Sequence, residues 1–161
     1  MDIGIGLWCL QSTATNPRSF GRAYQELTED ARLAEQHGIH SLWLSEHHGY
    51  YDGYCPALMP AASAALAATE NLQVGTGVLL LPLHEPQRVA NAANHLNQQF
   101  PERFHLGLGM GYRPIEFEMK DRHMSQRLKL MTSGLDTLSA NTQTPTWVGI
   151  SSEQAAERAG R

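Results

Sequence analysis

Short apolar runs alternate along the chain with longer stretches in which apolar residues recur every three or four positions. The short runs predict five strands, at residues 3–10, 41–45, 72–81, 104–108 and 146–150. The helical periodicity after each run predicts helices at 20–37, 57–69 and 86–100, a helical region from 114 to 138, and a helix that begins near 151. This order of strand and helix, in one domain over residues 1–161, is typical of a parallel sheet with right-handed crossovers, either a barrel or a doubly wound sheet.

The predicted strand at 41–45 ends abruptly in Glu46, His47 and His48. The carboxyl ends of strands carry the chemistry in parallel α/β proteins, so we expect a site here. Adjacent side chains alternate between the two faces of a strand, which predicts that only one of the two histidines faces the site. A neutral imidazole can take or give a proton near neutral pH, and a purely structural role is the open alternative. The three residues do not match the H-E-x-x-H zinc pattern, and we therefore expect no metal site.

Glycines mark the next two predicted strands. Gly75 and Gly77 interrupt the run at 72–81, and a glycine inside a strand often marks a place where a ligand lies against bare backbone. Residues 107–111 read G-x-G-x-G, but Tyr112 stands where the G-x-G-x-x-G dinucleotide fingerprint needs its last glycine. This segment is either a tight strand exit or the floor beneath a flat ligand.

A fourth feature follows the last predicted strand. Ser151 and Gln154 form the S-x-x-Q pattern of a capping box, which predicts the start of a helix. Such a start is either a generic cap or an anion site, because free N–H groups and the helix dipole attract phosphate. The strand ends share one edge of a parallel sheet. Together they would offer a proton-transfer group, exposed backbone, a glycine-rich surface beneath a ligand and a phosphate-binding site. A phosphorylated planar cofactor such as FMN would use all four.

The composition limits which binding partners and which cellular compartment we expect for this protein. The 12 basic and 16 acidic residues give a net charge of −4, with no basic patch, which disfavours nucleic acid as a partner. The two cysteines form no CxxC pair, as expected of a reduced cytoplasmic protein. The amino terminus lacks a basic region, and its apolar run is too short for a signal peptide or a membrane span, so we expect a cytoplasmic protein with no membrane partner.

Four segments together resemble one known family. They read SLWLSEHH from Ser41, VGTGVLLLPLHEP from Val74, RFHLGLGMGYRPIEF from Arg103 and PTWVGISS from Pro145. In this order they are similar to bacterial-luciferase-like flavin-dependent monooxygenases. The resemblance implies a TIM-barrel flavoprotein that uses oxygen and reduced FMN, supplied by a separate flavin reductase, with a flavin hydroperoxide acting on a small organic substrate. It also implies a homo- or heterodimer formed through the helices at 57–69 and 86–99.

The resemblance also implies roles for individual residues. His47 matches the catalytic histidine of the family, and Glu46 lies beside the flavin. Gly77 and Val78 fall where the family has a non-prolyl cis peptide against the isoalloxazine ring. The other matching positions line the next strand end, at Gly109, Met110 and Tyr112, or form the phosphate loop, at Ser151 and Ser152.

Two departures from the family pattern change these expectations. Met110 stands where luciferase has a phosphate-side arginine, so the phosphate is held more weakly or by Arg113. A complete eight-unit barrel takes roughly 250 residues, whereas this chain has five predicted units and stops at Arg161, in the helix after the phosphate loop. We therefore expect an incomplete barrel of the TIM type with two exposed sheet edges, and a chain that is oligomeric or marginally stable.

Two other functions are open at this point. The deazaflavin-dependent branch of the same superfamily would place its cofactor in the same pattern. A degenerate flavin-binding or subunit-type protein would retain the flavin without turnover.

Overall fold

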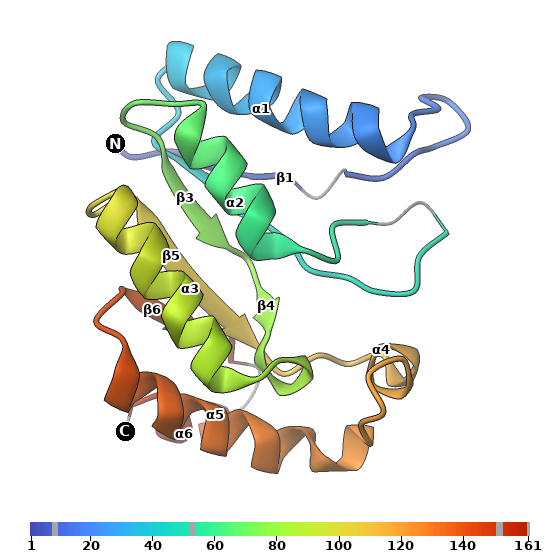
Figure 1. The fold of residues 1–161 in the computed structure, drawn as a ribbon, viewed down its shortest axis with the longest axis vertical. Coiled ribbons are helices and arrows are strands. Elements are labelled where there is room, and N and C mark those ends of the chain that lie inside the picture. The colour runs from blue at the N-terminus through green and yellow to red at the C-terminus, as the bar shows by residue number, and fades with distance from the viewer. Residues whose placement is uncertain (8–9, 52–53, 151–152, 161) are drawn as a thin grey trace.

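The structure is a computed structural model that describes residues 1–7, 10–51, 54–150 and 153–160. Strands and helices alternate along the whole described chain (Figure 1). The strands are β1 (Gly4–Leu7), β2 (Ser41–Leu44), β3 (Gln73–Thr76), β4 (Leu79–Leu80), β5 (Phe104–Gly109) and β6 (Thr146–Val148). The helices are α1 (Phe20–Gln36), α2 (Leu58–Ala67), α3 (Pro86–Gln99), α4 (Pro114–Glu118), α5 (Arg127–Asn141) and α6 (Glu153–Ala159), with 3₁₀ turns η1 (Leu81–Leu83) and η2 (Met124–Gln126).

Every strand pair in the sheet is parallel. β1 pairs with β2, β2 with β3, β3 with β5, and β5 with β6. The short β4 continues the line of β3 and also pairs with β5. Helices α1, α2 and α3 lie in sequence along the sheet, and α5 packs against α3 (Figure 1). The predicted alternation of strand and helix around a parallel sheet is confirmed, and it brings the carboxyl ends of the strands to one edge.

The third predicted strand differs most from the structure. The sequence predicts one strand at 72–81, whereas the structure has β3, a break at residues 77–78, and then β4 and η1. The Thr76 hydroxyl donates to the Gly107 carbonyl at 2.7 Å and accepts from the Gly107 N–H at 2.8 Å, so a side chain replaces the backbone ladder there. Pro82 has no N–H to donate, and the strand ends before it.

The helical region predicted from 114 to 138 is three separate pieces, α4, η2 and α5. The chain turns between α4 and η2, where Asp121 has a φ of 51°. The apolar stripe expected along this region is therefore interrupted. Met131 and Leu138 are buried, but Leu128 is 45% exposed. The other predicted elements are confirmed, with their ends shifted by a few residues.

Small side chains allow close packing of α2. Ala61, Ala62 and Ala65 are buried in the main core, and α2 contacts both α1 and β3. The sequence predicts this close approach from the density of alanine between 57 and 69. Among the described residues, no helix combines the length and the apolar character that a membrane crossing requires.

One carboxylate ties the end of α1 to the turn before β3. Glu35 accepts hydrogen bonds from the backbone N–H groups of Glu70, Asn71 and Leu72, at distances of 2.5 to 3.1 Å. Burial alone would raise the pKa of the Glu35 carboxyl, but the three N–H donors outweigh it and hold this pKa below its usual 4.5. The ionised carboxylate therefore stabilises the folded chain.

We expect Glu35→Gln to lower the free energy of unfolding by about 1 kcal/mol at pH 7. This value is near the low end of the contribution of hydrogen bonds to a charged acceptor, because the carboxylate lies near solvent. Because the pKa is lower in the folded chain, this contribution is present above the unfolded pKa and is lost as the pH falls through the folded pKa. Urea unfolding should show a gap between the two proteins at pH 7 that narrows at pH 3. A gap of equal size at both pH values contradicts this account. Glu118→Gln, at an exposed position, is the control.

Candidate active site

A pocket of about 590 Å³ lies where the carboxyl ends of the central strands meet. Its lining comes from the segments that follow β2, β3, β5 and β6, and from the start of α5. We call it the strand-end pocket; its lining residues are Ser45, Glu46, His47, Gly77, Val78, Leu80, Gly109, Met110, Gly111, Tyr112, Arg127, Gly149 and Ile150.

The structure brings most of the predicted site residues to this pocket. His47, Glu46, Gly77, Val78, Gly109, Met110 and Tyr112 all line it. Ser151 and Ser152 lie outside the described residues, although their neighbours Gly149 and Ile150 line the pocket. His47 lines the pocket and His48 does not, as the alternation of side chains along a strand predicts.

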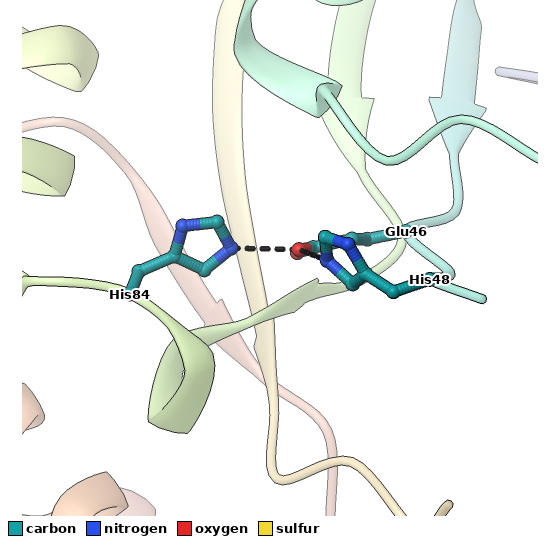
Figure 2. Close-up of side chains that lie close together, drawn as sticks. All are labelled: Glu46, His48 and His84. Atoms are coloured by element: carbon teal, nitrogen blue, oxygen red, sulfur yellow. Dashed lines mark hydrogen bonds and ion pairs between the residues drawn. The ribbon is translucent and has the colours of Figure 1, made fainter. Parts of the chain in front are cut away.

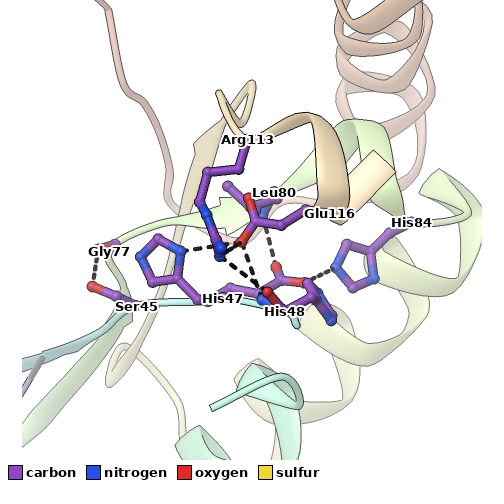
Figure 3. Close-up of polar contacts among 9 residues, drawn as sticks. Ser45, His47, His48, Gly77, Leu80, His84, Arg113 and Glu116 are labelled. Carbon is purple, nitrogen blue, oxygen red and sulfur yellow. Dashed lines mark hydrogen bonds and ion pairs between the residues drawn. The ribbon is translucent and has the colours of Figure 1, made fainter. Parts of the chain in front are cut away.

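His47 is held between a carboxylate and aromatic rings. Its Nδ1 lies 3.2 Å from Oε1 of Glu116 (Figure 3), and its ring stacks on Tyr54 with centroids 4.6 Å apart. The rings of Tyr50 and Tyr112 lie edge-on to it, with centroids at 5.6 and 6.4 Å. Because an ionised carboxylate only accepts hydrogen bonds, Nδ1 carries the proton in this arrangement. Nε2 then keeps the lone pair that can accept a proton.

Glu116 is fully buried beside His47 and belongs to α4. Its Oε1 also accepts from the backbone N–H of His48 at 3.1 Å and lies 3.5 Å from Nη1 of Arg113. Its Oε2 has no hydrogen-bond partner among the described residues. Sequence reasoning did not single out Glu116. Its presence in the matching segment at 103–117 is the only signal that could have pointed to it.

The carboxylate of Glu46 is turned to two other histidines. Oε1 lies 2.5 Å from Nε2 of His48 and 2.7 Å from Nε2 of His84, and Oε2 accepts the Leu80 N–H at 2.8 Å. Burial, the largest influence, raises the pKa of Glu46, but the hydrogen bonds of His48, His84 and Leu80 together lower this pKa to about 2. Glu46 is therefore an anion at neutral pH that joins the end of β2 to β4 and the segment after η1.

The floor of the pocket is bare backbone beside a cis peptide bond. The Gly77–Val78 bond is cis, as the family resemblance implies, and the Ser45 hydroxyl donates to the Gly77 carbonyl at 2.7 Å. At Gly109, a Cβ atom would lie only 2.5 Å from Cγ2 of Val78. A larger residue at Gly109 would thus clash with the Val78 side chain.

Arg113, which the sequence suggests as a possible holder of the phosphate, does not line the strand-end pocket. Its Nη1 donates to the His48 carbonyl at 3.1 Å, and its guanidinium lies over the Tyr50 ring at 4.2 Å, so it braces the loop after β2 and does not line the pocket. The cation that lines the pocket is Arg127, the first residue of α5. No hydrogen bond or ion pair joins the Arg127 guanidinium to another described side chain. The sequence analysis missed Arg127 because it placed this region in an apolar helical stripe.

Comparison with protein families matches residues 3–140 to the luciferase-like monooxygenase family. The chain belongs to this family. A luciferase-like monooxygenase of Escherichia coli K12 is 40% identical over 88 residues, which are 54% of this chain and 26% of that protein. The alkanal monooxygenase alpha chain of the Kryptophanaron alfredi symbiont is 32% identical over 114 residues, which are 71% of this chain and 32% of that protein. The matched segments thus cover about a third or less of the length of these relatives.

Two solved structures share the fold. One is the oxygenating constituent of the 3,6-diketocamphane monooxygenase of Pseudomonas putida, in complex with FMN, with a TM-score of 0.78 at 24% identity over 86% of this chain and 38% of that chain. The other is an F420-dependent secondary alcohol dehydrogenase with an F420–acetone adduct, with a TM-score of 0.78 at 19% identity over 99% of this chain and 55% of that chain. These likenesses confirm the predicted fold class, a parallel α/β structure of the TIM-barrel type with about five βα units.

Proposed function

We propose that the strand-end pocket binds FMN and that the protein serves a monooxygenase reaction, in which reduced FMN and oxygen act on a small organic substrate. One observation carries the proposal: residues from four strand ends and one helix start meet around a single pocket. His47, the Gly77–Val78 peptide, Gly109 and Arg127 come from segments far apart in the sequence, and all of them line it. A flat ring with a phosphate tail would use each of them.

The residues present fit this cofactor. The pocket volume lies within the range of about 300–1,000 Å³ that is usual for cofactor and ligand sites. Glycine at 109 allows the backbone to pack against the Val78 side chain, where a Cβ atom has no room, and both residues line the pocket. No hydrogen bond or ion pair occupies the Arg127 guanidinium within the described part of the chain, so it can form charge-assisted hydrogen bonds with a phosphate.

In this proposal the protein residues orient the flavin ring and transfer a proton. When bound, reduced flavin supplies the electrons that activate oxygen. Glu116 fixes the ring of His47 through Nδ1, which leaves Nε2 to hold or transfer the proton. Tyr54 covers one face of the same imidazole and Tyr50 contacts it edge-on, so both rings restrict its exposure to water. Both tyrosines belong to the segment that follows β2.

The comparisons support FMN and leave one rival cofactor. The family match and the FMN complex of the diketocamphane enzyme support FMN. The structural match to the F420-dependent dehydrogenase extends over 99% of this chain, so a deazaflavin is the second candidate. A dimer through α2 and α3, and a separate reductase as the source of reduced FMN, belong to the proposal as well.

Titration with FMN tests the proposal directly. We expect Arg127→Ala to weaken FMN binding about 10-fold or more, because a charge-assisted hydrogen bond is worth about 1.5–3 kcal/mol. Riboflavin, which lacks the phosphate, should bind both proteins equally. Lys129→Ala, at an exposed position two residues further along α5, is the matched control. Flavin absorbance and fluorescence quenching measure both affinities.

Three results would contradict the proposal or change the cofactor. If the wild-type chain binds neither FMN nor F420, the proposed cofactor site is wrong. If it binds F420 and not FMN, the deazaflavin reading replaces the FMN reading. If Arg127→Ala weakens riboflavin and FMN by the same factor, Arg127 does not hold the phosphate.

A further inference from the structure

Glu46, His48 and His84 form a compact cluster of two imidazoles around one carboxylate (Figure 2). The ligand atoms that they offer all lie within 4.8 Å of one another. Glu46 and His48 follow β2, whereas His84 follows η1, so two separate segments build the cluster. We call it the His–Glu–His cluster.

The donor set matches a transition-metal site. Two imidazole nitrogens and one carboxylate oxygen are the ligands found in three-ligand zinc sites, which keep a further position for water. Both Nε2 atoms approach the same oxygen, Oε1 of Glu46, at 2.5 and 2.7 Å. The other oxygen, Oε2, accepts the Leu80 N–H, a contact that orients the carboxylate from outside the cluster. Metal–ligand distances of about 2.0–2.2 Å in tetrahedral geometry put ligand atoms about 3.3 Å apart, so each imidazole would have to move away from Oε1 by roughly 0.6–0.8 Å.

The hydrogen bonds within the cluster show what a metal ion would have to replace. Each Nε2 atom lies at hydrogen-bond distance from Oε1 of Glu46, so a metal ion would take the place of the protons between these atoms. A neutral histidine can offer Nε2 as a ligand once its proton is on Nδ1. Binding therefore requires a change of tautomer at both imidazoles.

A second pocket gives access to the cluster. His84 has 30% of its side chain exposed and lines a pocket of about 350 Å³ between the starts of α2 and α3. Glu85 and Arg88 line the same pocket, so one acidic and one basic side chain face the route by which an ion would arrive. Glu46 lines the strand-end pocket on its other side. The cluster thus lies in the wall between two pockets.

We propose that Glu46, His48 and His84 bind one divalent transition-metal ion of the zinc class, with water completing the coordination. Such an ion would link the segment after β2, in which Glu46 and His48 flank His47, to the segment after η1. The sequence analysis expected no metal because it considered only the adjacent residues 46–48. The proposal does not depend on the flavin, and it stands or falls separately from the proposed function.

Titration with Co²⁺ tests the site without any enzymatic assay. We expect the full chain to bind one Co²⁺ with the intense visible absorption of a four-coordinate ion, and Zn²⁺ to displace it. His84→Gln should weaken binding by at least about 100-fold, since it removes a ligand. His95→Gln, at an exposed position on α3, should bind Co²⁺ like the wild type.

Nitrogen NMR of the wild-type imidazoles provides a second readout that needs no substitution. Zn²⁺ should shift the Nε2 resonances of His48 and His84 together, at one equivalent. The proposal is overturned if His84→Gln binds Co²⁺ as tightly as the wild type, or if Zn²⁺ shifts only the exposed histidines. Absence of binding would mean that the cluster is a hydrogen-bonded brace only.

Discussion

His47→Ala lowers turnover by about 10²–10⁴-fold if this imidazole handles the proton of the reaction, which is the usual contribution of a positioned acid or base. The measurement is oxygen consumption by the protein with FMN, NAD(P)H, a flavin reductase and a substrate panel of aldehydes, alkanes and sulfonates. FMN affinity should change far less than turnover. The reason is that His47 is one of many residues that line the pocket, and the pocket floor and Arg127 remain in this variant.

A matched pair of variants separates this role from a structural one. His95→Ala removes an exposed imidazole on α3 and should leave turnover unchanged. Glu116→Gln keeps the size of the side chain that contacts Nδ1 of His47, so it should lower turnover and alter the pH profile while the fold is retained. Equal turnover in wild type and His47→Ala would remove the central catalytic claim. FMN binding without turnover in the wild type would instead favour the non-catalytic alternative.

Gly107→Ala should destabilise the fold by at least about 3 kcal/mol, or prevent folding. A Cβ atom at this position would lie 1.9 Å from the backbone carbonyl oxygen of Thr76, so the two strands would have to separate. The pair of hydrogen bonds between the Thr76 hydroxyl and Gly107 would be lost at the same time. Urea unfolding followed by far-UV circular dichroism measures the change.

Gly21→Ala is the control for this substitution. Nothing lies within 4 Å of a Cβ atom built at Gly21, which belongs to α1. Alanine should therefore stabilise the chain by about 0.5–1 kcal/mol, because glycine is costly within a helix. A Gly107→Ala protein as stable as the wild type would show that β3 and β5 are not packed as closely as described.

The features predicted from the sequence depend on local pattern. His47 follows a buried apolar run, and Gly109 ends the next strand but one, so both were assigned to strand ends before any contact was known. Parallel pairing then places strand ends at one edge, and this rule predicts that the two residues meet. The structure confirms the alternation of strand and helix, and His47 and Gly109 both line the strand-end pocket.

The features that were missed depend on how distant segments turn. Arg113 follows the glycine-rich strand exit closely, and the sequence therefore offers it as a cation for the phosphate, with a weaker phosphate contact as the other option. The turn between α4 and η2 instead brings Arg127 to the pocket. The Arg113 guanidinium lies over the Tyr50 ring and donates a hydrogen bond to the His48 carbonyl. His84 meets Glu46 for a similar reason, because the break after β3 and the turn η1 bring it back toward β2. No periodicity in the sequence encodes such contacts.

The most direct test of the account is a crystal structure of the protein grown with FMN. The account predicts the isoalloxazine ring in the strand-end pocket, against the Gly77–Val78 peptide and Gly109. His47 should lie within hydrogen-bond reach of the ring, and Arg127 should contact the phosphate. A flavin bound elsewhere, or a ring in the pocket with His47 turned away from it, would contradict the account.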